Sequence, residues 1–95
     1  MKLQPAIVRL CQDLNLEHIK SQSTLSILKT CVAIDNQFIY VTVFGNTAEY
    51  LAKYGKKGGR VLFKDWDLDV KRVNDKTVYD FTVRKMDVID FKEEI

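Results

Sequence analysis

The chain has 95 residues, of which 46% are hydrophobic and 29% are charged. This length supports one small domain with one core, and the hydrophobic content excludes a disordered chain. Fifteen basic against thirteen acidic residues leave a net charge of +2, so binding to nucleic acid requires the basic residues to segregate on one face. No apolar run reaches the roughly 18 residues of a membrane-spanning helix, and no signal segment opens the chain. We therefore expect a soluble, cytoplasmic protein without a membrane partner.

The N-terminal segment admits two interpretations. Residues 6–11 are apolar and partly β-branched, which favours a strand. Ile7, Leu10, Cys11 and Leu14 also recur at helical spacing, and Pro5 suits a first helical turn, so a helix is the alternative. Residues 15–23 are polar and predict a loop.

Two strands joined by a tight turn are predicted next. The first covers residues 24–34, with Leu25 and Ile27 facing the core and a bulge at Leu28 and Lys29. Asp35-Asn36-Gln37 forms the turn, and the second strand runs from Phe38 to Phe44.

The strand from Phe38 to Phe44 alternates strictly. Its β-branched row suits a core, whereas the opposite row carries rings too large and too polar-tipped for a second core face in a small domain. The rows are Ile39, Val41 and Val43 on one side, and Phe38, Tyr40, Thr42 and Phe44 on the other. Exposed rings on a strand are a means of stacking the bases of single-stranded nucleic acid. The alternative is that these rings pack under a loop or at a subunit interface.

A short helix of about two turns is predicted after this strand. Asn46 has the chemistry of an N-cap, and Glu49 three residues later completes a capping box. Ala48, Leu51 and Ala52 give a narrow apolar stripe, and Gly55 suits the left-handed residue that ends many helices. Residues 56–59 form a basic turn.

A long hairpin completes the chain. A strand over residues 60–73 with an irregularity near Asp65 leads to a tip at residues 74–76 and a return strand over residues 77–83, which residues 86–91 extend. Residues 92–95 are expected to fray. The order of five strands, with one helix between the third and fourth, predicts an all-β protein: a single OB-fold barrel domain over residues 1–95.

Residues 38–83 resemble the bacterial and phage single-stranded DNA-binding proteins. The resemblance rests on Val43-Phe44-Gly45-Asn46-Thr47-Ala48-Glu49, then Lys57-Gly58-Gly59-Arg60-Val61, at matching positions of strand, helix and turn. It implies that Phe38 and Phe44 stack on bases, with Tyr40 between them on the same face. A third stacking ring of the family falls near Val73, and Trp66 replaces it only with a one-residue shift.

The resemblance implies sequence-independent binding of single-stranded DNA in replication, recombination or repair, with a phage or mobile-element type of protein and a homodimer or homotetramer. Lys71, Arg72 and Lys76 at the hairpin are the candidate phosphate contacts, although they also fit an ordinary solvated surface. The sequence departs from the family at Cys11-Gln12, at Asp65, and in lacking its long acidic-tipped tail, so recruitment of partners by that tail is not expected. The alternative function is an OB-fold accessory subunit of a polymerase, primase or helicase, acting through protein contacts.

No enzyme or cofactor signature accompanies these features. His18 has no neighbouring nucleophile or carboxylate in a recognisable triad. Cys11 and Cys31 form no C-x-x-C pair, and we expect them to be buried free thiols rather than zinc ligands. Asp65, Asp67 and Asp69 alternate like the start of a calcium loop, but Val70 and Lys76 stand where that loop needs Gly and Glu. We therefore expect no metal, no cofactor and no catalysis.

Overall fold

The computed structural model describes residues 1–12, 14, 17–18 and 25–92 of the chain. Within these residues the strands and one helix follow in the order β1 (Lys2–Leu3), β2 (Ala6–Leu10), β3 (Glu17–His18), β4 (Ser26–Ile34), β5 (Gln37–Phe44), α1 (Gly45–Tyr54), β6 (Arg60–Val73) and β7 (Lys76–Val88). The expected fraying of the last residues falls mainly on 93–95, which lie outside the described part.

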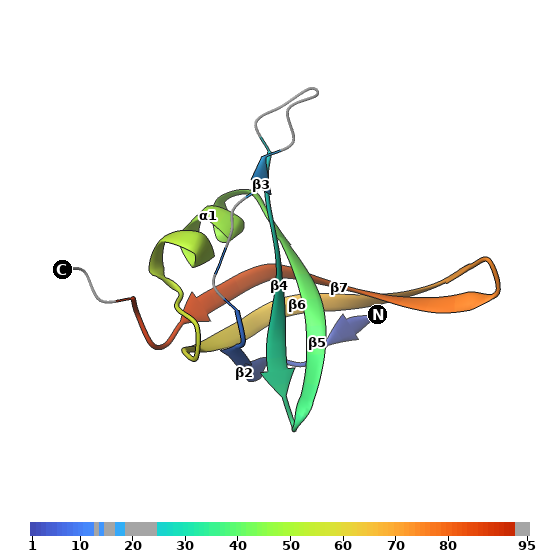
Figure 1. Ribbon diagram of the computed structural model, residues 1–95, viewed down its shortest axis with the longest axis horizontal. Coiled ribbons are helices and arrows are strands. Elements are labelled where there is room, and N and C mark those ends of the chain that lie inside the picture. Colours follow the sequence, from blue (N-terminus) through green and yellow to red (C-terminus); the bar gives the residue numbers. More distant parts are fainter. Residues whose placement is uncertain (13, 15–16, 19–24, 93–95) are drawn as a thin grey trace.

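Five of the described strands form a closed ring of hydrogen-bonded neighbours. β6 pairs with β2, β2 with β4, β4 with β5, β5 with β7 in parallel, and β7 with β6 again. β4 and β5 cross β6 and β7 steeply, and the tip of the β6–β7 hairpin projects well beyond the ring (Figure 1). The mainly β composition, with one short helix between the third and fourth strands of the ring, fits the predicted OB-fold.

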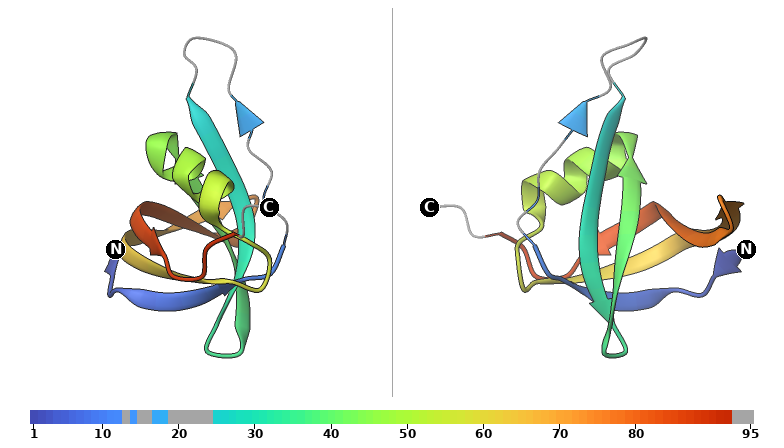
Figure 2. Two further views of the ribbon diagram at one scale, coloured as in Figure 1. Left: turned by 90° about the vertical axis from the view of Figure 1, so that its left-hand side faces the viewer. Right: turned by 45° about the vertical axis from the view of Figure 1, so that its right-hand side comes forward.

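The core fills the inside of this ring. Val8, Leu28, Val43, Val61 and Phe63 are at most 1% exposed. The helix lies beside the end of β4 that carries β3 (Figures 1 and 2), and it buries Ala48 and Leu51 in the same core.

The N-terminal half agrees with the sequence expectations in part. Residues 6–10 form the predicted strand rather than the alternative helix, but the predicted loop contains the short strand β3. The other residues of that loop lie outside the described part. In β4 the phase is opposite to the prediction: Leu25 is exposed and Ile27 half-buried, while the inward row is Ser26, Leu28, Thr30 and Val32. The predicted bulge is also wrong, because β4 pairs with β5 without a register shift. The apolar residues of this strand do not alternate cleanly, so neighbouring strands decide its phase.

The helix begins two residues earlier than predicted, with Phe44 rather than Asn46 at its N-cap, and has no capping side chain. Gly45 is the first residue of the helix, and its φ is 65°, a backbone conformation that favours glycine. The chain therefore turns into the helix before it reaches Asn46. Gly55 is not left-handed, since its φ is −78°. A Cβ there would lie 2.8 Å from the Leu51 side chain and 2.9 Å from that of Leu14, so close packing explains this glycine. The helix has ten residues, longer than the two turns expected.

The irregularity predicted near Asp65 is confirmed and has a consequence for Trp66. The pairing of β6 with β7 shifts register between Phe63 and Trp66. A bulge adds one residue and reverses the alternation of the strand, so both Phe63 and Trp66 face inward, with ring centroids 5.2 Å apart. Trp66 is only 4% exposed and donates a 2.7 Å hydrogen bond from its indole nitrogen to the Gln4 carbonyl. The expectation that Trp66 stacks on bases is therefore wrong.

Candidate nucleic-acid interface

The outer face of β5 carries an exposed row of rings. Phe38 is 71% exposed, Tyr40 69% and Phe44 41%. Between them, Val41 and Val43 are buried in the core. The strand alternation predicted from the sequence is thus confirmed, and all three rings are accessible from outside the ring of strands.

A charged groove lies between these rings and the β6–β7 hairpin. The cavity has a volume of about 350 Å³, and Lys29, Thr42 and Phe44 lie on its β4–β5 side. Asp69, Lys71 and Asp80 line it from the hairpin. A ring and two lysines thus border one open depression on the outer face.

A second, more apolar groove adjoins the other end of the ring row. It has a volume of about 500 Å³ and lies where β5 and β7 diverge. Phe38 and Tyr40 line it from β5, and Val78 and Tyr79 line it from β7. Tyr79 is 59% exposed, and it lies before Phe81–Val83, the stretch of β7 that pairs with β5.

Ion pairs neutralise most of the carboxylates on this face. Arg84 donates a 2.7 Å hydrogen bond to Asp67, and the Lys71 ammonium lies 3.4 Å from Asp80. The hydrogen bond from Arg84 lowers the pKa of Asp67, so this carboxylate stays ionised and paired. The acidic row in β6, which by itself repels phosphate, is therefore partly screened by cations of the same face.

The predicted phosphate contacts occupy two faces of the hairpin. Strand pairing places Lys71 opposite Val78 and Lys76 opposite Val73, on the face that continues the ring row. Arg72 pairs with Thr77 and points to the opposite face. All three side chains are exposed. Because Arg72 points to the opposite face, only Lys71 and Lys76 share a face with the rings.

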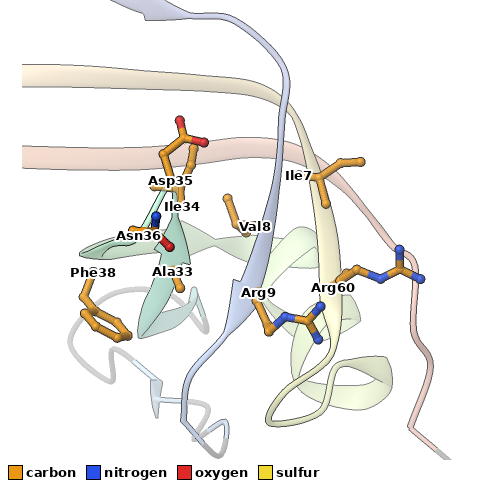
Figure 3. Close-up of a pocket in the computed structure, with 9 residues that line it drawn as sticks. All are labelled: Ile7, Val8, Arg9, Ala33, Ile34, Asp35, Asn36, Phe38 and Arg60. Atoms are coloured by element: carbon orange, nitrogen blue, oxygen red, sulfur yellow. The ribbon is translucent and has the colours of Figure 1, made fainter.

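A further cavity of about 450 Å³ lies between β2 and the β4–β5 turn. In the close-up, Asp35, Asn36 and Phe38 stand on one side of it, and Arg9 and Arg60 on the other (Figure 3). Both arginines already have partners.

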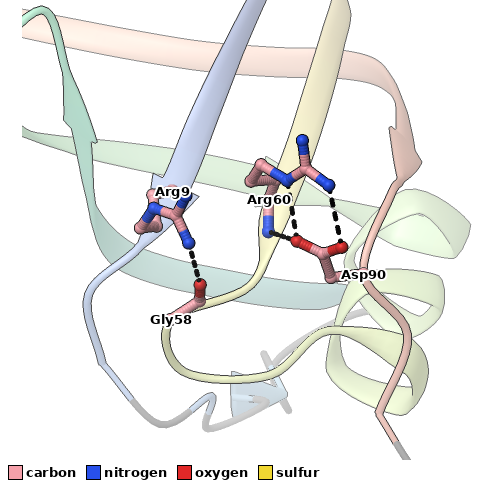
Figure 4. Close-up of polar contacts among 4 residues, drawn as sticks. All are labelled: Arg9, Gly58, Arg60 and Asp90. Carbon is pink, nitrogen blue, oxygen red and sulfur yellow. Dashed lines mark hydrogen bonds and ion pairs between the residues drawn. The ribbon is translucent and has the colours of Figure 1, made fainter.

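Arg9 donates a 2.6 Å hydrogen bond to the Gly58 carbonyl, and Arg60 binds the Asp90 carboxylate with its backbone and its guanidinium (Figure 4). Because both arginines are bound to other parts of the chain, this cavity is a weaker phosphate site than the outer face of β5.

The structure adds two residues to the candidate site that were not expected from the sequence. Tyr79 was placed in the return strand without a role, yet it borders the apolar groove beside Tyr40. Lys29 lies directly opposite Thr42 in the β4–β5 ladder and so faces outward with the rings. Lys29 could have been identified from the sequence if β4 had been given its correct phase. The length of the predicted hairpin could have indicated that Tyr79 is exposed.

The described residues contain no group of three or more His, Cys, Asp or Glu side chains placed to hold a metal ion. In the same part of the chain, no helix has the length and apolarity to cross a membrane.

Comparisons with known proteins support the fold. No family model matches the sequence, and no curated protein does. Among solved structures, the chain is similar to the mitochondrial single-stranded DNA binding protein Rim1 from S. cerevisiae, with a TM-score of 0.58 and 14% identity over 95% of each chain. At this low identity the likeness shows a shared fold, and it agrees with the OB-fold expected from the order of strands and helix.

Proposed function

We propose that this protein binds single-stranded DNA without sequence preference, using the outer face of β5 and the neighbouring hairpin. The observation that carries the proposal is the row of Phe38, Tyr40 and Phe44, three exposed rings on one strand face. Rings in this arrangement stack on bases, and stacking contributes about 1–3 kcal/mol per base whatever the sequence. The similarity of fold to a single-stranded DNA-binding protein supports the same assignment.

The two grooves give single-stranded DNA a path across this face. Bases stacked on Phe38 and Tyr40 have room in the apolar groove, which Val78 and Tyr79 border from β7. The charged groove lies beside Phe44 and presents Lys29 and Lys71 to the phosphates. Lys76 extends this basic face to the hairpin tip.

The resemblance of residues 38–83 supports further proposals. These are a role in replication, recombination or repair, a phage or mobile-element type of protein, assembly as a homo-oligomer and contact with a replication enzyme. We also propose a cytoplasmic location, on the composition of the sequence. Stacking and phosphate contacts need no cofactor and no catalytic step, so we propose that the protein is a binding protein and not an enzyme.

The direct test is titration of fluorescent oligo-dT with the purified protein at several salt concentrations. Binding should weaken with salt, with a log–log slope of about −0.7 for each phosphate contacted. Replacement of Tyr40 or Phe44 by Ala should raise the Kd by the equivalent of about 1–3 kcal/mol while leaving thermal unfolding nearly unchanged. Tyrosine emission should fall on binding, because Tyr40 is exposed and stacks on bases. Trp66 is buried and has no access to bases.

Phe91→Ala provides the matched control. Phe91 is also an exposed ring, 52% accessible, but it packs against Tyr54 of α1, away from the ring row. This variant should bind oligo-dT like the parent. Equal losses for Phe44→Ala and Phe91→Ala would contradict the assignment of the outer face of β5.

An accessory subunit of a polymerase, primase or helicase is the second candidate. The ion pairs Lys71–Asp80 and Arg84–Asp67 favour it, since they reduce the positive charge available to phosphate on this face. In that case the rings pack against a protein. Absence of oligo-dT binding at low salt would support this function over the first.

A further inference from the structure

Of the two cysteines of the chain, Cys11 directly follows β2 and Cys31 lies in the adjacent strand β4. The β2–β4 ladder pairs Arg9 with Ala33 and Leu10 with Val32, so its next step places Cys11 opposite Cys31. A 3.1 Å hydrogen bond from the Cys11 amide to the Cys31 carbonyl confirms this position. Directly opposed residues of antiparallel strands project to the same face of a sheet.

This position satisfies the main distance requirement of a disulfide. Opposed residues in an antiparallel ladder have Cα atoms about 4.5–5.5 Å apart, within the range of about 4.4–6.8 Å found in disulfides. The ladder also loosens here, because the Cys31 amide donates to the Gln12 side chain (3.3 Å) instead of to Cys11. The backbone of Cys11 can therefore adjust without breaking a reciprocal pair of hydrogen bonds.

The two thiols differ in access. Cys31 is only 6% exposed, whereas Cys11 is half-buried and reachable from solvent. Burial raises the pKa of the Cys31 thiol, and the neighbouring Cys11 thiol adds to that rise. An oxidant thus reaches Cys11 first, while Cys31 stays protected until its neighbour has reacted.

We propose that Cys11 and Cys31 form a reversible cross-strand disulfide when the protein meets a peroxide. The Cys11 thiolate attacks one oxygen of hydrogen peroxide, which breaks the O–O bond, gives the sulfenic acid and releases hydroxide. The Cys31 sulfur then attacks the Cys11 sulfur, and the departing hydroxide takes up the Cys31 proton as water. Overall, two thiols and one hydrogen peroxide give one disulfide and two waters.

The bond would form beside the proposed DNA-binding face. Cys31 is the direct ladder partner of Tyr40, the middle ring of the row. Oxidation therefore ties β2 to β4 next to the strand that presents the rings. The inference does not depend on the proposed function, since the bond can be measured without nucleic acid.

The test is mass spectrometry of the reduced full-length protein after exposure to hydrogen peroxide, with alkylation of the remaining thiols. The product should be a monomer that has lost about 2 Da, resists alkylation and regains both thiols with dithiothreitol. Proteolysis should yield one peptide pair joined through Cys11 and Cys31. The bond should form about tenfold faster, or more, in the folded protein than in urea, because the fold holds the two sulfurs together.

Two variants identify the roles of the thiols. In Cys31→Ala, Cys11 should lack its partner and proceed to the sulfinic acid or to a disulfide-linked dimer. In Cys11→Ser, Cys31 should remain reduced under the same exposure. The proposal fails if the parent protein accumulates Cys11 sulfinic acid while Cys31 stays alkylatable, or if its disulfide forms no faster when folded.

Discussion

At the scale of single residues, Trp66 shows how burial separates one aromatic side chain from the others. It packs between Phe63 and Phe81, with ring centroids 5.2 Å and 5.9 Å away, and uses its indole N–H internally. Trp66→Ala should therefore lower the free energy of unfolding by about 3–5 kcal/mol, the usual cost of removing a large core ring. Chemical denaturation followed by circular dichroism measures this loss.

Tyr40→Ala is the contrasting variant for that experiment, because Tyr40 is 69% exposed. Its unfolding midpoint should stay close to the parent's. A Trp66→Ala protein as stable as the parent would show that Trp66 is not a core residue.

Thr30 offers a second test at this scale. Its side chain is 1% exposed on the inward row of β4, and its hydroxyl has no hydrogen-bond partner among the described residues. An unsatisfied buried hydroxyl costs free energy, whereas Val has nearly the same shape without the polar atom.

Thr30→Val should therefore raise the free energy of unfolding by about 1 kcal/mol, measured by urea denaturation. Thr42→Val is the matched control, since Thr42 faces outward opposite Lys29 and should gain little. Destabilisation of Thr30→Val would mean that the hydroxyl is satisfied in solution.

At the scale of elements, the β6–β7 hairpin determines how far the binding face extends. Its pairing continues from the ring to the tip, where Val73 opposes Lys76, and Asn74 and Asp75 have positive φ values of 52° and 65°. Both residue types tolerate this conformation in tight turns. The hairpin therefore holds Lys76 away from the ring, on the face shared with Phe44.

Lys76→Gln tests this arrangement. Among the described residues Lys76 has no ion pair, so the substitution removes a charge without releasing a carboxylate. The oligo-dT salt slope should become less steep by about 0.7, the loss of one phosphate contact. Lys57→Gln in the α1–β6 turn, which lies far from the hairpin tip (Figure 1), should leave the slope unchanged. Equal effects of the two variants would indicate a general charge effect rather than a contact.

At the scale of the whole molecule, the contact between Arg60 and Asp90 joins the start of β6 to the segment after β7. The Asp90 carboxylate accepts hydrogen bonds from the Arg60 amide (2.9 Å) and from its guanidinium (2.9 and 3.2 Å) (Figure 4). The guanidinium hydrogen bond, with help from the amide, lowers the pKa of Asp90 from 3.8 to about 2. A carboxyl whose pKa is lower in the folded state stabilises the fold above its unfolded pKa.

The contribution of Asp90 should therefore be complete above about pH 5 and be lost as the pH falls toward 2. Asp90→Asn should melt at a lower temperature than the parent at pH 7, and this difference should shrink as the pH approaches 2. Differential scanning calorimetry at several pH values follows the change. A difference that stays constant down to pH 2 would mean that ionisation of Asp90 has no part in holding the fold.

Features that depend on neighbours along the chain follow from the amino-acid sequence alone. The strict alternation of residues 38–44 predicted both the buried Val row and the exposed rings, because alternate side chains of a strand face opposite ways. Turn-forming residues likewise located the tips of the two hairpins.

Features that depend on distant strands are set by the packing of the whole sheet and could not be predicted. Pairing with β2 and β5 set the phase of β4, placed Lys29 outside and brought Cys11 opposite Cys31. The bulge in β6 turned Trp66 into the core, and the extension of the hairpin beyond the ring left Tyr79 exposed. Register between strands is fixed by packing across the whole sheet, and a local pattern of residues carries no direct information about it.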